Sequence, residues 1–488
     1  MNIFITENAY CFSKKAMNPF KKFFDRYKRT QILNLLTQSA PEAIEAHGRK
    51  LILPAFRRAA RQLPAYRKIL SDYGLSSDDI NTLTDFKQKV PVIAKEDIFP
   101  SSAIEELLMQ GQVNSLANVM VSSGFSEKNS YGFGTFSDRQ ETAFMIDTIL
   151  EYLFQISRKK TFLLNCLPMG VKIPSALPMA ETSVRSDLAL SILQKLQTAF
   201  EQFLIVGDPC FLKKLVEDGC TAGLDWPKIN VSLILGSEWF SDSYRHYMAQ
   251  LLGVDFNRPE QGYIGANFGV TELDLSLAHE TIETIRLRAE MQKNPEFRRK
   301  VLGNQGRQVC PELLVYYPNR FFLETSSQHE LIFTMLNPKA LTPLIRYNTN
   351  DNGFLLSHNT LKNILAEEQR GDLLPKLKLP LLALQGRTNK NLDLQGKSVY
   401  PEDIKEGLYS DTEVAGLTTG CFRMSGQQNI GQIEIQLKKH IPLTPDLRQK
   451  FRKALLKFAG ADMEIVVYHY HDFPYGVELN YERKFIYS

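Results

Sequence analysis

The chain has no apolar run approaching the roughly 20 residues that a membrane-spanning helix needs, so the sequence predicts no membrane span. Its six cysteines are scattered and include no C-x-x-C pair. This spacing argues against a disulfide framework or a structural zinc site and favours a reducing compartment. A formal net charge of only +4 gives no reason to expect general affinity for nucleic acid.

The N-terminal residues 1–7 have no basic start, no long apolar centre and no small-residue cleavage site. They do not look like a secretory signal, so we expect a cytoplasmic protein. Residues 14–29, in contrast, interleave basic and aromatic side chains, a composition that can contact an anionic membrane or nucleic acid. More often such a segment is a helix with a solvated basic face over a packed aromatic face, and we favour that interpretation.

Hydrophobic residues make up 43% of the sequence and charged residues 23%, as in ordinary globular proteins. The length of 488 residues exceeds one ordinary core, so two or more domains are expected. We predict a helical N-terminal part of the large domain over residues 1–110 and an α/β core over residues 111–385. A smaller α+β C-terminal domain is predicted over residues 386–488.

The middle of the chain alternates strand and helix patterns. Residues 161–167 and 230–235 are apolar runs typical of buried strands, and residues 186–200 and 241–252 have the periodicity of amphipathic helices. Such alternation predicts a mostly parallel sheet covered by helices on both faces.

Patterns further along the chain predict more strands and one helix. Residues 311–324 and 330–336 read as successive strands. In the C-terminal part, residues 433–437 alternate like a strand with one exposed face, and residues 463–471 form another strand pattern. Residues 445–458 have the pattern of a basic amphipathic helix.

The most informative stretch begins with an apolar run over residues 341–345, which predicts the end of a buried strand. Arg346, Tyr347 and a polar turn cluster follow directly. A strand ending in this way brings Arg346 and Asp351 to the carboxyl edge of the sheet, where open α/β sheets bind ligands. A carboxylate there suits the two hydroxyls of a ribose. The alternative is an ordinary strand-to-turn junction with a surface carboxylate.

A turn of small residues follows the β-rich apolar run at residues 119–121. Hydroxyl and backbone N–H groups in such a turn can surround anionic oxygens, which makes it a candidate phosphate-binding loop. The candidate contacts are Ser122, Ser123, Gly124 and Ser126. A simple β-turn is the alternative interpretation.

The second buried strand of the β/α region leads into Gly236, Ser237 and Glu238. A Gly-x-Glu strand exit lets a flat ring approach the backbone closely, because the glycine has no side chain. Taken alone, this segment is one of many strand-to-helix turns.

A further segment carries groups suited to a magnesium nucleotide. The ring of Phe268 can lie against adenine, and Gly269 permits a tight turn. The hydroxyl of Thr271 can meet phosphate, and the carboxylate of Glu272 can hold Mg²⁺. A competing register over residues 263–267 keeps a tyrosine but loses both the glycine and the glutamate, so we prefer the register that uses residues 268–272. The alternative is a solvent-facing glutamate on a loop.

In their order along the chain, the four segments resemble the motifs of adenylate-forming enzymes (the ANL superfamily), in particular its phenylacetate–CoA ligase-like branch. Those motifs read Ser-Ser-Gly-Thr-Thr-Gly-Lys, Gly-Gly-Glu, Tyr-Gly-x-Thr-Glu and Pro-Leu-Ile-Arg-Tyr-x-Thr-x-Asp. The resemblance implies that Asp351 holds both ribose hydroxyls of ATP, that residues 236–238 lie along the adenine, and that Glu272 holds Mg²⁺. The chain departs from the pattern at Phe125 and Glu127, which remove a hydroxyl and place a negative charge near phosphate.

The C-terminal part extends this resemblance. The segment around Arg387 is similar to the family's Gly-Arg-x-Asp hinge, with Asn389 near the place of the Asp, and Pro401 opens a helix as in Gly-x-x-Val-x-Pro. The resemblance implies a second ribose contact from Arg387 and a mobile lid domain that rotates during the reaction. It also implies that Lys484, with Arg483 as the near alternative, enters the site during adenylation.

The function implied is ATP-dependent activation of a carboxylic acid as an acyl-adenylate with release of pyrophosphate. An aromatic or other apolar acid is favoured, as in secondary metabolism, and transfer to a thiol follows, from CoA or from the phosphopantetheine of a carrier protein. ATP and Mg²⁺ are the expected cofactors, with CoA as the candidate acceptor. The alternative is a degenerate adenylate-forming fold that acts as a binding or regulatory protein.

Overall fold

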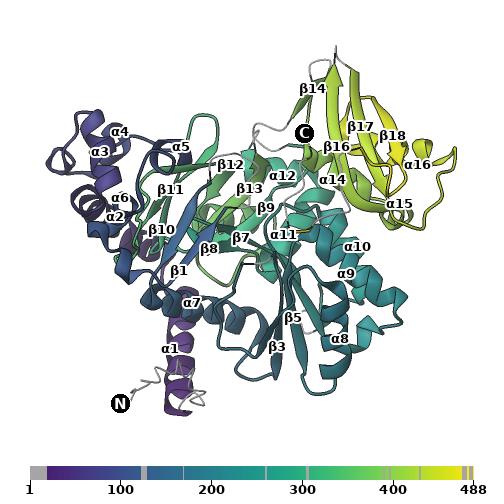
Figure 1. The fold of residues 1–488 in the computed structure, drawn as a ribbon, viewed down its shortest axis with the longest axis horizontal. Coiled ribbons are helices and arrows are strands. Elements are labelled where there is room, and N and C mark those ends of the chain that lie inside the picture. Colours follow the sequence, from purple (N-terminus) through teal and green to yellow (C-terminus); the bar gives the residue numbers. More distant parts are fainter. Residues whose placement is uncertain are drawn as a thin grey trace, which may run out of the picture.

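The computed structural model describes residues 19–122, 129–168, 170–258, 261–303, 307–387, 391–394, 397–427, 430–474, 481–482 and 487. Figure 1 shows a large body built on a central sheet and a smaller lobe that holds the C-terminal strands and helices. The architecture confirms the predicted α/β class, with a large sheet covered by helices and an α+β part at the C-terminal end. Within the described residues, no helix combines the length and the apolar composition needed to cross a bilayer.

The first part of the described chain is helical. Its helices are α1 Pro19–Gln38, α2 Pro41–Gln62, α3 Pro64–Asp72, α4 Leu83–Lys89, α5 Lys95–Ile98 and α6 Ile104–Leu107. Proline stands in the first turn of α2 and α3, where its missing N–H costs no helical hydrogen bond. Phe56 packs edge-on against Tyr66 and Phe86, with ring centroids 6.4 and 5.8 Å away, and these contacts hold α2, α3 and α4 together.

Helix α1 differs from the interpretation favoured for this basic and aromatic segment. Phe23, Phe24 and Tyr27 are 72%, 53% and 54% exposed, so the aromatic side chains do not form a packed face. Only the second half of α1, with Ile32 and Leu36, packs into a core cluster. The first half projects from the body (Figure 1), so the core formed by the described residues does not cover it.

The sheet has eleven strands, in the order β10-β11-β12-β13-β9-β8-β7-β6-β5-β3-β4. Strands β4, β3, β5, β6 and β7 are parallel, as predicted for this segment. Their bounds are β3 Thr161–Cys166, β4 Met179–Glu181, β5 Gln202–Gly207, β6 Val231–Leu235 and β7 Ile264–Val270. The helices of this half are α7 Phe136–Phe154, α8 Ser186–Leu196, α9 Pro209–Thr221 and α10 Asp242–Leu252. Every residue of β3 and β5 is buried, which explains their continuous apolar runs.

The other half of the sheet is antiparallel, which the sequence patterns did not indicate. Its strands are β8 Asp274–His279, β9 Glu312–Tyr316, β10 Phe321–Thr325, β11 Glu330–Met335, β12 Tyr347–Leu356 and β13 Leu381–Arg387. The accompanying helices are α11 Ile282–Lys293, α12 Pro295–Leu302 and α13 His358–Glu367. Residues 311–324, predicted as one strand, form most of β9 and β10, which are separated by a turn that contains Pro318.

Strand β12, which carries Asp351, begins later than predicted. Residues 341–345 are buried but lie outside any strand, because Pro343 lacks the N–H that a strand ladder needs. Strand β12 instead runs through the polar cluster that we expected to be a turn. It pairs antiparallel with β11 and β13, so the rule for the carboxyl ends of parallel strands does not apply to Asp351. Arg346 is a structural residue, because it contacts Glu324 at 3.2 Å and the carbonyl oxygen of Lys87 at 2.8 Å.

A separate hairpin carries the start of the candidate phosphate loop. Strands β1 Asn118–Val121 and β2 Tyr131–Gly134 pair antiparallel, with Val121 opposite Tyr131. The loop between them contains Ser123, Gly124 and Ser126, which lie outside the described residues.

The C-terminal part is α+β, as expected. Its elements are β14 Leu392–Leu394, β15 Lys397–Val399, α14 Pro401–Tyr409, α15 Thr412–Leu417, β16 Thr418–Gln427, β17 Ile430–Leu437, α16 Leu447–Ala459 and β18 Met463–Tyr468. The boundary proposed at residue 386 falls within the last residues of β13. The expectation of an exposed face on β17 is wrong, because Glu434 and Gln436 are buried. The Glu434 carboxylate accepts a hydrogen bond from the Tyr468 hydroxyl, and the Gln436 amide donates one to the carbonyl oxygen of Tyr470.

Candidate active site

Two serines close the base of the candidate phosphate loop. The backbone N–H of Ser122 donates to the carbonyl oxygen of Ser130 at 3.0 Å, and the backbone N–H of Ser130 donates to Oγ of Ser122 at 3.0 Å. Of the predicted phosphate contacts, Ser122 is therefore placed at the root of the loop. Nothing is described of Ser123, Gly124 and Ser126, or of Phe125 and Glu127, which stood out as departures in the same loop.

The carboxylate of Glu272 joins this loop base to the stretch that begins β12. Ser130 donates its hydroxyl to Oε2 of Glu272 at 2.9 Å, and Tyr347 donates its hydroxyl to Oε1 at 2.6 Å. Burial, and then the neighbouring Glu272 charge, raise the pKa of Tyr347 far above its usual range, so its phenol stays protonated. Tyr347 and Ser130 therefore fix the orientation of the carboxylate predicted to hold Mg²⁺.

Close backbone approaches explain the glycines around Thr271 and Glu272. A Cβ on Gly132 would overlap the carbonyl oxygen of Thr271, and a Cβ on Gly269 would overlap that of Leu275.

The ring of Phe268 is half-buried against Phe333, with centroids 6.2 Å apart.

The competing register placed Tyr263 in the role of Phe268. Tyr263 is buried, and its hydroxyl donates to the carbonyl oxygen of Glu280 at 2.9 Å. Its ring packs edge-on against Phe154, with centroids 5.3 Å apart. Both ends of this side chain are therefore occupied within the core, which favours the register that uses Phe268 and Glu272.

Asp351 and Arg387 form an ion pair across two neighbouring strands. They are directly opposite in the β12–β13 register, and Nε of Arg387 lies 3.2 Å from Oδ1 of Asp351. The Asp351 carboxylate raises the pKa of Arg387, with smaller contributions from Glu272 and Glu238. Segments far apart in the sequence thus pair one carboxylate with the guanidinium and place two more close enough to act on it by charge. The Arg387 side chain is 55% exposed, so it remains accessible to a ligand.

Three buried polar atoms without a partner belong to described residues within two positions of this pair. Among the described residues, Oγ1 of Thr349, Oδ1 of Asn352 and Nε2 of Gln385 are buried and have no hydrogen-bond partner. Buried polar atoms are normally paired, so such a group near one ion pair indicates a place for a polar ligand. No sequence pattern pointed to Gln385 or Asn352 as candidate ligand contacts.

The donor set around Glu272 fits a magnesium ion shared with phosphate. In the described part of the chain, no group of three or more His, Cys, Asp or Glu side chains could hold a metal ion by itself. Magnesium in nucleotide sites is usually bound by one or two carboxylates together with phosphate oxygens. A single oriented carboxylate such as Glu272 meets that requirement. Lys484 and Arg483, the candidates for the group that reaches the α-phosphate, lie outside the described residues.

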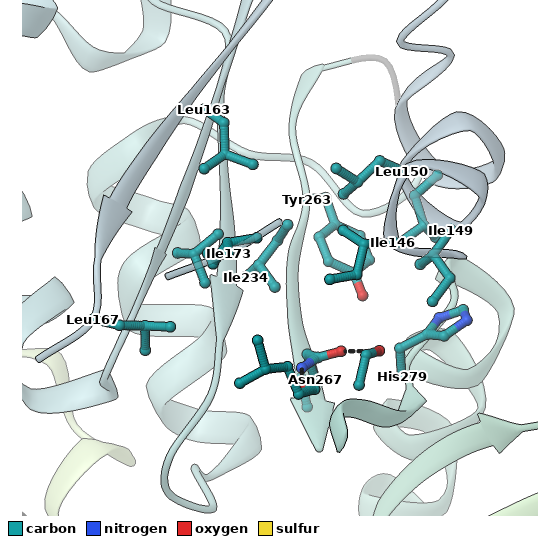
Figure 2. Close-up of a pocket in the computed structure, with 15 residues that line it drawn as sticks. Ile146, Ile149, Leu150, Leu163, Leu167, Ile173, Ile234, Tyr263, Asn267 and His279 are labelled. Carbon is teal, nitrogen blue, oxygen red and sulfur yellow. Dashed lines mark hydrogen bonds between the residues drawn. The ribbon is translucent and has the colours of Figure 1, made fainter. Parts of the chain in front are cut away.

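A cavity of about 90 Å³ lies beside these segments, between α7 and the sheet. Figure 2 shows Ile146, Ile149 and Leu150 facing it on one side and Ile173 on the other. Asn267, which lines the cavity, directly precedes Phe268, and its carbonyl oxygen lies 3.6 Å from where a Cβ of Gly236 would stand. The cavity therefore adjoins the segments predicted to bind nucleotide. Sequence patterns missed it, because most of its residues are ordinary apolar positions spread from 146 to 279.

Neither a family model nor a curated protein matches the chain by sequence. Solved structures do match it. A 2-hydroxyisobutyryl-CoA ligase in the postadenylation state, in complex with R3-HIB-AMP, superposes with a TM-score of 0.67 at 13% identity, covering 93% of this chain and 91% of that chain. The same ligase with 2-HIB-AMP and CoA, in the thioesterification state, gives a TM-score of 0.54 at 14% identity, covering 92% and 90%.

The chain has the fold of the adenylate-forming ligases. The fold predicted from the four motifs is confirmed. Its assignment to the phenylacetate–CoA ligase-like branch stays a prediction, since these structures do not single out that branch.

In this adenylate-forming fold, Glu238 contacts the C-terminal part. Its Oε2 lies 3.1 Å from Nζ of Lys405 and accepts the hydroxyl of Tyr487 at 2.9 Å. Lys405 also donates to the carbonyl oxygen of Trp239 at 3.1 Å. The Glu238 side chain is therefore engaged by the C-terminal part. Ser237 is exposed, with a φ of 70°, and is the part of this segment that a flat ring can contact.

Helix α14 provides a second contact between the C-terminal part and the large domain. Glu406 accepts hydrogen bonds from the backbone N–H groups of Asp242 and Ser243 at 3.1 and 3.0 Å, so a carboxylate of α14 caps the first turn of α10. Glu402 lies against Gly386, whose φ of 99° and close approach leave no room for a side chain. These contacts position Arg387 and the elements that follow it.

Proposed function

We propose that this protein activates a carboxylic acid with ATP, forming an acyl-adenylate and releasing pyrophosphate. The adenylate is then passed to a thiol, of CoA or of a carrier protein's phosphopantetheine. The observation that carries the proposal is the convergence of Asp351, Arg387 and Glu272 at one place, beside the loop base at Ser122 and Ser130. The similar ligase described above supports it, because that protein was captured with an acyl-AMP and with CoA.

The roles of the nucleotide-binding residues follow from their chemistry. Asp351 accepts hydrogen bonds from the two ribose hydroxyls, and the accessible guanidinium of Arg387 adds a donor to the same sugar. Buried Thr349 Oγ1 offers a further polar contact near Asp351. Adenine lies between the backbone of residues 236–238 and the ring of Phe268.

The phosphates are bound by the hairpin loop and by Thr271. Ser122, Ser123, Gly124 and Ser126 supply hydroxyl and N–H donors to them. Glu272, held by Tyr347 and Ser130, is placed to carry Mg²⁺. The ion, when bound, neutralises charge on the phosphate oxygens.

The acid needs no general base, because a carboxylate is already ionised at neutral pH. The difficulty is bringing this anion to a polyanion and stabilising the charge on the transferring group. Lys484 supplies a positive charge to the α-phosphate and the incoming carboxylate, by position and electrostatics alone. The apolar cavity behind Asn267 receives the rest of the acid, which supports an apolar substrate.

The test is ATP–pyrophosphate exchange over a panel of aromatic and aliphatic acids, with Lys484→Ala as the variant. The proposal predicts acid-dependent exchange that this variant lowers by at least about 100-fold. It also predicts that the wild-type product reacts with CoA or a phosphopantetheine thiol to give a thioester. Absence of exchange, together with no thermal stabilisation by ATP and Mg²⁺, would instead support a degenerate binding protein, which Phe125 and Glu127 in the loop favour.

A further inference from the structure

The wall of the cavity is aliphatic and uncharged. Of the described residues that line it, eleven are aliphatic, and none carries a charge. They are Ile146, Ile149, Leu150, Leu153, Leu163, Leu167, Ile173, Val206, Ile234, Ala266 and Leu275. A second carboxylate or an ammonium group on the substrate would have to enter this wall without a counter-charge, which is costly.

The four polar residues in the wall are paired with protein groups. Ser276 donates its hydroxyl to Oδ1 of Asn267 at 2.7 Å, and Nδ2 of Asn267 donates to the carbonyl oxygen of Leu275 at 2.9 Å. Figure 2 shows the bond between Asn267 and Ser276 at the edge of the cavity. The hydroxyl of Tyr263 is engaged by Glu280, as described above.

His279 is paired in the same way. Nδ1 lies 3.1 Å from the carbonyl oxygen of Glu280, and Nε2 lies 3.0 Å from the hydroxyl of Tyr317. Burial lowers the pKa of His279 to about 4, so the ring is neutral at physiological pH, with Nδ1–H as donor and Nε2 as acceptor. Neither nitrogen is left for a ligand, and the ring supplies no charge.

The volume limits what can enter. The cavity holds about 90 Å³, against about 150 Å³ for an apolar protein cavity that accepts benzene. On the scale of that benzene cavity, which offers about 25 Å³ for each of six carbons, this cavity has room for about three to four carbons. A planar aromatic ring does not fit within this space, whereas a short flexible chain does.

We infer that the acid is a short, saturated aliphatic one, of about four to five carbons, without a polar substituent on its chain. Three carbons occupy the cavity, and the α-carbon and carboxylate lie at its mouth near Asn267. This inference rests on the proposed adenylation and narrows it, since it selects the aliphatic class over the aromatic one. Ile146 and Ile149 of α7 form the wall that limits chain length.

The experiment measures kcat/KM in ATP–pyrophosphate exchange for the full chain. The panel contains straight-chain acids from acetate to decanoate, benzoate, phenylacetate and 4-hydroxybutyrate. We expect a maximum at butyrate or pentanoate and values at least about tenfold lower for octanoate, benzoate and phenylacetate. For 4-hydroxybutyrate we expect a loss of about tenfold or more relative to pentanoate, because its hydroxyl would be buried without a partner.

A variant pair tests whether α7 sets the length. Ile146→Ala removes three carbons from the wall and is expected to move the optimum to acids about two to three carbons longer. Ile156→Ala is the matched control, because Ile156 packs on the same apolar cluster without lining the cavity; its optimum should stay at four to five carbons. If Ile146→Ala does not fold, Ile146→Val replaces it, and the preferred acid is then expected to be about one carbon longer than for the wild type.

The outcomes separate the two claims. Exchange that is greatest with an aromatic, hydroxylated or long-chain acid overturns this inference and leaves the adenylation intact. The inference is also overturned, with the adenylation left intact, if Ile146→Ala and Ile156→Ala both prefer the same chain length as the wild type. Exchange with none of the acids, in a protein that is folded by circular dichroism, overturns the proposed function and this inference with it.

Discussion

The hydroxyl of Tyr347 lies 2.6 Å from Oε1 of Glu272, a residue 75 positions earlier in the chain. This single bond joins the strand that carries Asp351 to the segment expected to hold magnesium. Ser130 holds the other carboxylate oxygen, so Glu272 is oriented from both sides before any ligand binds. Pre-orientation of this kind lowers the cost of assembling the site.

Removal of the Tyr347 hydroxyl should weaken magnesium use more than folding. In Tyr347→Phe, the Glu272 carboxylate loses one of its two fixed partners, and a hydrogen bond to a charged group is worth about 1.5–3 kcal/mol. We expect the Mg²⁺ concentration for half-maximal exchange to rise by about tenfold or more. Titration of exchange activity with MgCl₂ at fixed ATP measures this.

Tyr66→Phe is the control for that substitution. Tyr66 is fully buried, and its hydroxyl has no hydrogen-bond partner among the described residues. Its removal should leave the magnesium dependence unchanged and should not destabilise the protein. If both variants titrate like the wild type, Tyr347 does not orient a metal-binding carboxylate.

Asp351→Asn should raise the KM for ATP by about 10- to 100-fold, because it replaces a charged acceptor for the ribose hydroxyls by a neutral one. The fold should persist, since the asparagine oxygen can still accept the hydrogen bond from Arg387. The comparison is Asp372→Asn, which breaks an exposed ion pair with Arg286 and should change the KM less than about twofold. Equal KM values for both variants would exclude Asp351 from nucleotide binding.

The contact between Glu238 and Lys405 should hold the C-terminal part against the large domain. Lys405→Met leaves the largely buried Glu238 without its cation, which we expect to cost about 2 kcal/mol or more. Limited proteolysis between residues 387 and 401 should become faster. The double variant Glu238→Gln, Lys405→Met should recover at least half of the lost stability, because no unpaired charge remains. Full additivity of the two single variants in urea unfolding would argue against this coupling.

His279 should make the protein sensitive to mild acid. Its pKa is lowered by burial to about 4, while in the unfolded chain it stays near 6.5. Between these values the unfolded state binds a proton that the native state does not, so stability falls as the pH drops from 6.5 to 4, by up to about 3 kcal/mol. In His279→Gln this part of the pH dependence should disappear.

Urea unfolding at pH 6.5, 5.5 and 4.5 measures that slope. His246→Gln is the control, because the His246 side chain is 53% exposed. This variant should keep the slope of the wild type. If His279→Gln keeps it as well, the buried ring is not the group that titrates.

The sequence identified residues better than it identified their geometry. The argument that singled out Asp351 as a candidate was partly wrong, since the strand that carries it is antiparallel and begins at Tyr347. Tyr347 lies in the same motif as Asp351, but the sequence did not indicate its role, because its partner Glu272 comes from another part of the chain. Local patterns show which residue types are present, but not which distant residues they meet.

The features that the sequence missed share this cause. Glu238 looked like a nucleotide contact, while its side chain pairs with Lys405, 167 residues away. The cavity is formed by apolar side chains that periodicity can only assign to a core. The exposed aromatic side chains of α1 were expected to be packed, because amphipathic patterns do not show whether a helix projects from the body.

The most direct test of the central claim is a crystal structure of the full chain with Mg²⁺ and a non-hydrolysable ATP analogue. We expect the ribose hydroxyls to lie within hydrogen-bonding distance of Asp351, with Arg387 beside the sugar. We expect the metal ion at Glu272 and the phosphates over the loop that starts at Ser122. A nucleotide bound elsewhere, or a site that remains empty at saturating nucleotide, would contradict it.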